Sequence, residues 1–112
     1  MFCDNTRRNS LVLVAGDTLN KTFVINGIEA NYIESIYFVC ADLGLNEKLT
    51  KNQELENEWV LIVDSEKTKN FQAKVTDYDL KIIFVDGTLY TATYRNSFTI
   101  KENKNAIDSG VI

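Results

Sequence analysis

The apolar residues of this chain recur in short runs, in which they alternate with polar residues, and turn-forming residues separate the runs. Alternation with a period of two is typical of half-buried β-strands, whereas an amphipathic helix repeats its apolar residues every three to four positions. No segment carries a helical repeat long enough for a stable helix. The candidate strands cover residues 10–15, 18–26, 34–42, 45–52, 58–64, 77–85, 88–94 and 97–101.

Strands of this number and spacing predict an all-β fold, an immunoglobulin-like antiparallel β-sandwich of about seven to eight strands. A small barrel is the alternative. With 112 residues the chain has the size of one domain. We expect a short N-terminal extension at 1–9, a single sandwich domain at 10–102, and a C-terminal tail at 103–112 that is loose or docks on a neighbour.

Three positions in this pattern predict burial or exposure. Residues 34–42 are apolar on both faces, which indicates a central strand with Cys40 as a small core residue. Trp59 begins a strongly alternating strand and is expected in the core. Residues 45–52 carry lysines and few large side chains, which favours an edge strand. Cys3 lies near the terminus, so two free thiols are expected rather than a disulfide.

Residues 65–71 interrupt the strands with a short polar segment. It is too short to be a stable helix alone, so we expect one helical turn or an irregular crossing between sheets. Ser65 is a possible cap of that turn.

The Asp86-Gly87 pair between two apolar runs predicts a hairpin with a two-residue type I′ turn. Directly opposite residues in a hairpin share a face, so the loop length determines which side chains meet. The expected pairs are Phe84 with Leu89 and Ile82 with Thr91 on one face, and Ile83 with Tyr90 and Val85 with Thr88 on the other.

Both faces of this hairpin are therefore apolar. If one face packs in the core, Ile83, Val85 and Tyr90 form a surface patch that predicts a partner or a self-assembly contact, unless a long loop covers it. Tyr90 and Tyr94 share a face and could stack on a sugar ring or line a subunit contact, or they could be core residues. The candidate interface residues are Ile83, Val85, Tyr90 and Tyr94.

The residues that most enzymes and metal sites require are missing. The chain has no histidine, its two cysteines are far apart, and its glycines occur singly. These absences argue against the commonest general base, a Cys-x-x-Cys metal site and a phosphate-binding loop. The carboxylates Asp77, Asp79 and Asp86 could bind calcium or catalyse glycoside hydrolysis, but they are more simply solvated strand and turn residues. We expect no catalytic residue, metal or cofactor.

The overall charge is −4 and both signs are mixed along the chain, which argues against a nucleic-acid surface. No apolar run is long enough to cross a membrane, and the first residues lack the apolar stretch of a signal peptide. We therefore expect a protein made in the cytoplasm that binds neither nucleic acid nor membrane.

Three segments of the chain, taken in their order, resemble a known family. They are "LVLVAGDTLNKTFVING", "WVLIVDSEKTKNFQ" and "DYDLKIIFVDGTLYTATYRNSFTIKE". Together they resemble the N-terminal domain of phage baseplate upper proteins and related short virion proteins of tailed phages and prophages. Two family glycines are replaced, one by the "AKVTDY" segment and one by Asn96.

The resemblance implies a non-enzymatic structural role in the virion, in which the sandwich docks on other virion proteins or on itself, usually in symmetric rings. It implies no active site. A carbohydrate-binding or cell-surface β-sandwich domain is the alternative, and it requires two or more exposed aromatic side chains on a concave face or loop rim.

Overall fold

The computed structural model describes residues 9–92 and 96–103, and these form an all-β sandwich. Eight of its strands have four or more residues, and β5 and β7 are shorter. The strands are β1 (Asn9–Val14), β2 (Leu19–Val24), β3 (Ile33–Cys40), β4 (Leu45–Lys48), β5 (Thr50–Lys51), β6 (Glu58–Val63), β7 (Lys74–Thr76), β8 (Asp79–Phe84), β9 (Leu89–Ala92) and β10 (Asn96–Lys101). Single helical turns are η1 (Ala30–Tyr32), η2 (Ala41–Leu43) and α1 (Ser65–Thr68).

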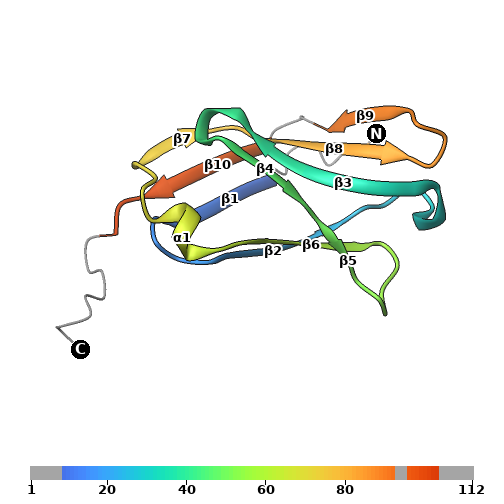
Figure 1. The fold of residues 1–112 in the computed structure, drawn as a ribbon, viewed down its shortest axis with the longest axis horizontal. Coiled ribbons are helices and arrows are strands. Elements are labelled where there is room, and N and C mark those ends of the chain that lie inside the picture. The colour runs from blue at the N-terminus through green and yellow to red at the C-terminus, as the bar shows by residue number, and fades with distance from the viewer. Residues whose placement is uncertain (1–8, 93–95, 104–112) are drawn as a thin grey trace.

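The strands form two layers (Figure 1). One layer combines the ladders β4-β3-β8-β9 and β1-β10-β7, because β8 continues the line of β7 and β10 continues that of β9. The ladder β2-β6-β5 is the facing layer. Between β4 and β5 the chain passes from one layer to the other at the buried residue Leu49, whose N–H donates to the backbone oxygen of Ile36 at 2.8 Å.

The first and last strands of the sandwich lie side by side. β1 pairs with β10 in parallel, from Asn9 opposite Asn96 to Val14 opposite Lys101, and the other strand pairs described are antiparallel. A parallel pair needs no tight turn between its strands, so the local sequence around either strand does not predict it.

The core confirms the predicted central strand and its cysteine. β3 lies between β4 and β8, and Cys40 is buried and free. At the centre the Phe38 ring packs edge-on against Phe98, with ring centroids 5.7 Å apart, and it lies tilted by 31° against the Tyr78 ring, with centroids 4.8 Å apart. Trp59 is buried as predicted, and its indole N–H has no hydrogen-bond partner within the part of the chain that the structure describes.

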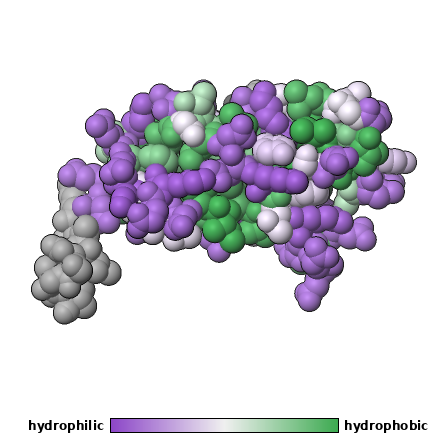
Figure 2. Space-filling model, in the orientation of Figure 1, coloured by the Kyte–Doolittle hydropathy of each residue, from purple (hydrophilic) through white to green (hydrophobic). Residues whose placement is uncertain are grey.

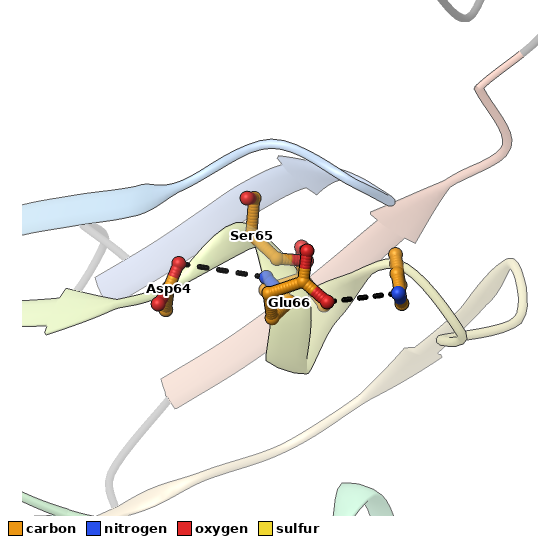
Figure 3. A network of polar contacts seen from close by, with 5 residues as sticks. Asp64, Ser65 and Glu66 are labelled. Carbon is orange, nitrogen blue, oxygen red and sulfur yellow. Dashed lines mark hydrogen bonds and ion pairs between the residues drawn. The ribbon is translucent and has the colours of Figure 1, made fainter. Parts of the chain in front are cut away.

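The segment after β6 forms the single helical turn that its sequence predicts, but Ser65 is not its cap. Asp64 has the extended backbone of an N-cap, and its carboxylate accepts a hydrogen bond from the Glu66 N–H at 3.5 Å (Figure 3). Ser65 is already the first helical residue. Both residue types cap helices well, so the backbone of residue 64 decides which one does so.

Candidate functional site

The β8–β9 hairpin has a three-residue loop, and the predicted two-residue turn is wrong. Gly87 N–H donates to the Phe84 oxygen at 2.9 Å, and Phe84 N–H donates to the Thr88 oxygen at 2.9 Å. Gly87 has φ +91°, the left-handed conformation that closes such loops. Ile83 therefore pairs with Leu89, and Ile82 pairs with Tyr90. The shift by one residue moves every side chain of β9 to the opposite face.

Asp86 fastens this loop, which agrees with its interpretation as a turn residue. One carboxylate oxygen accepts hydrogen bonds from the N–H of Thr88 at 3.0 Å and from its hydroxyl at 2.8 Å. These donors hold the pKa of Asp86 below its ordinary value. Asp77 is exposed and Asp79 pairs with Val39. Across the described ranges no three carboxylates or cysteines gather as metal ligands.

Four apolar side chains surround the hairpin tip, and we name them the hairpin patch: Tyr32, Ile83, Val85 and Leu89. Val85 N–H donates to the Tyr32 oxygen at 2.9 Å, which ties the loop to η1. Leu89 is 59% exposed and Val85 is 58% exposed. Ile83 is half-buried and shares a face with Leu89. Apolar surface gathers at this end of the molecule (Figure 2).

Two of the predicted interface residues, Ile83 and Val85, thus lie together, whereas Tyr90 does not join them. The prediction that Ile83 and Tyr90 share a face is wrong, because the longer loop places Leu89, not Tyr90, opposite Ile83. Tyr94 lies outside the described residues. Tyr32 was missed because it belongs to a different segment, and no local pattern brings it to the hairpin.

Tyr90 lines a different feature, an open groove between β9 and β2 that we name the edge groove. Its volume is about 590 Å³. The buried side chains of Phe23 and Ile82 form part of its wall, and its rim carries Val24, 50% exposed, and Tyr90, 54% exposed. Ile28 and Ala92 also line it, so the groove is mostly apolar.

A second hollow lies at the other end of the sandwich, around α1. It has a volume of about 980 Å³, and its lining includes Asp17, Glu66, Lys69 and Glu102. Glu66 and Lys69 form an ion pair of 2.8 Å, so two of these charges already satisfy each other. The other two, Asp17 and Glu102, are both acidic, but they belong to no cluster of three metal-ligating side chains among the described residues.

Two buried groups with acidic protons stay neutral near pH 7. Burial raises the pKa of the Tyr78 phenol, and burial also raises the pKa of the Cys40 thiol. Neither side chain therefore supplies an anion to these surfaces. In the described part of the chain no helix is both long and apolar enough to cross a membrane.

Comparisons with known proteins add little. No protein-family model matches the sequence, and no curated protein matches it. One solved structure that matches, from Bacteroides vulgatus ATCC 8482, is provisionally described as a glycoside hydrolase. It is 14% identical, with a TM-score of 0.42, and the match covers 85% of this chain and 17% of that one. A likeness of this size carries no argument about activity.

Proposed function

We propose that this chain is a non-enzymatic structural module of a phage or prophage virion, of the tail or baseplate type, that acts through protein–protein contacts and self-assembly. The observation that supports the proposal is the hairpin patch. The resemblance of three segments to small virion β-sandwich domains supplies the virion context. The partners are other virion proteins and further copies of the chain.

The hairpin patch has the features of a protein contact surface. Ile83 and Leu89 pair across the hairpin, and Val85 lies in its loop, which Asp86 and the backbone hydrogen bond from Val85 to Tyr32 hold in place. A pre-ordered loop loses little conformational entropy when it binds, so more of the binding free energy is kept. Contiguous exposed apolar side chains are typical of interaction sites on small domains.

The carbohydrate-binding alternative has less support. It needs two or more exposed aromatic side chains on one concave surface. In the edge groove Tyr90 is exposed, whereas Phe23 and Tyr78 are buried. Trp59 is buried as well. Among the described residues that line the edge groove, Tyr90 is thus the one exposed aromatic ring, and the exposed Tyr32 belongs to the hairpin patch instead.

Light scattering over a wide concentration range tests the proposal. We expect the wild-type mass to rise with concentration to a defined dimer or ring. Leu89→Asp should weaken the association about tenfold or more, because a carboxylate would be buried against apolar surface. Ile62→Asp is the matched control, since Ile62 is equally exposed, at 59%, on the outer face of β6 in the other layer.

Two results would contradict the patch as a self-assembly contact. One is a monomer at every concentration, and the other is an equal loss of association in both variants. A general loss would mean that any added charge disrupts the particles, regardless of the surface that carries it.

A further inference from the structure

The edge groove has strand edges available on both sides. Among the described residues β2 pairs only with β6, and β9 pairs only with β8. Alternate N–H and C=O groups of an edge strand point away from its neighbour and can pair with an added strand. The groove therefore has the form of a site for β-strand addition, in which main-chain hydrogen bonds supply affinity and apolar pockets supply selectivity.

The apolar side chains of an added strand would meet the inner face of β9. Tyr90 lies opposite Ile82, and Ala92 lies opposite Leu80, so all four side chains face the groove. An occupant needs apolar side chains two or four positions apart, because every second residue of a strand faces the same way.

Residues 104–112, "KNAIDSGVI", have this spacing. Ile107, Ser109 and Val111 would share one face, and Asp108 and Gly110 the other. The first eight residues of the chain suit the groove less well. They contain Asp4, Arg7 and Arg8, and placing these charges against apolar walls is costly.

The place where the described chain ends decides which copy supplies the segment. β10 starts beside the groove, where the Asn96 side-chain amide donates to the Ala92 oxygen at 2.8 Å. It ends at the opposite end of the sandwich, where the Asn103 amide donates to the Ala15 oxygen at 3.1 Å (Figure 1). Returning along β10 would take about 20 Å, or six of the nine residues 104–112, at ~3.3 Å per residue. The rest of this segment is too short to fill the groove of the same molecule.

We propose that the edge groove of one copy binds residues 104–112 of a second copy as an added strand along β2, with Ile107 and Val111 packed against Tyr90 and Ile82. The contact joins one end of a molecule to the other end of the next. Such a head-to-tail contact generates a closed ring or an open filament. This inference rests on the proposed function in one respect, namely that the chain associates with further copies of itself.

Disulfide trapping between two full-length proteins tests this contact. Both carry Cys3→Ser, and Cys40 stays because it is buried. A tagged donor carries Ile107→Cys, and an untagged acceptor carries Tyr90→Cys. The control acceptor carries Ile62→Cys, which is similarly exposed but lies on the outer face of β6, away from the hairpin patch. After mild oxidation we expect at least about ten times more donor–acceptor dimer with the Tyr90 variant than with the Ile62 variant. Peptide mapping then identifies the linked residues.

Equal trapping by both acceptors would overturn the proposal, because it would indicate random collision. An intramolecular link in a single chain that carries both Ile107→Cys and Tyr90→Cys would also overturn it. Val24→Asp in the acceptor should reduce the trapped fraction at least about fivefold, because it places a charge on the groove rim.

The proposals for the hairpin patch and for the edge groove can be contradicted independently of each other. If Leu89→Asp abolishes association while the Tyr90 trap shows no preference, the proposed function stands and the tail contact is wrong. If the trap shows its preference while Leu89→Asp and Ile62→Asp associate like wild type, the tail contact stands and the hairpin patch is wrong.

Discussion

The Thr68 hydroxyl donates a hydrogen bond to the backbone oxygen of Asp17 at 2.7 Å, across 51 positions of sequence. The Thr68 hydroxyl oxygen in turn accepts a hydrogen bond from the Gly16 N–H at 3.1 Å. Thr68 is fully buried at the end of α1. One side chain thus joins the β1–β2 turn to the helical turn that follows β6, and it satisfies the polar backbone of the β1–β2 turn inside the protein.

Thr68→Val should therefore destabilise the fold by about 1–3 kcal/mol, because it keeps the shape of the side chain and removes the hydrogen-bond partner of two part-buried backbone groups. Urea unfolding monitored by Trp59 fluorescence measures the change. Thr68→Ser retains the hydroxyl and should cost less. If valine were tolerated as well as serine, the two hydrogen bonds would have no net effect on stability.

Phe98 holds the centre of the core, where its ring meets both Phe38 and Tyr78 edge-on. Phe98→Ala should destabilise the protein by about 3–5 kcal/mol, since it removes buried apolar surface and leaves a cavity. This loss is comparable to the whole stability of many small domains, so Phe98→Leu is the variant to measure if the alanine variant does not fold. A loss below about 1 kcal/mol for alanine, which is the size typical of a substitution at an exposed position, would contradict this packing.

Acidification should loosen the hairpin loop. The Thr88 N–H and hydroxyl lower the pKa of Asp86 from its ordinary 3.8. A carboxylate with a lowered pKa adds stability that is fully present above the unfolded pKa and is lost as the pH falls through the folded pKa. The amide NMR shift of Thr88 should titrate with a midpoint below 3.8. In Asp86→Asn this titration should vanish, and a wild-type midpoint at or above the ordinary value would contradict the contact.

Cys40 should resist alkylation in the folded protein. Its thiol is buried and its pKa is raised by that burial, so both access and the reactive thiolate are reduced. In a Cys3→Ser background we expect iodoacetamide to modify Cys40 at least about tenfold more slowly without denaturant than in concentrated urea. Mass spectrometry of timed samples measures both rates. Equal rates would show that the thiol is accessible in the native state.

The sequence by itself determined the strands and much of what each one buries. In β3 the alternation of Ile36, Phe38 and Cys40 is confirmed as the core face, and Trp59 is confirmed as buried. The lysine-bearing strand at 45–52 is confirmed at the edges of its ladders, as β4 and β5. Burial depends on which side chains are apolar. The alternation of apolar and polar residues within a single strand therefore shows which of its faces is buried.

Only the tertiary structure decided which surfaces the strands present. The Asp86-Gly87 pair fits a two-residue or a three-residue loop, and the observed loop places Leu89 rather than Tyr90 beside Ile83. The parallel pairing of β1 with β10, the switch of layers at Leu49 and the approach of Tyr32 to Val85 join segments far apart in the chain. Local alternation specifies a face but not a register or a partner, because those depend on the packing of the whole sandwich.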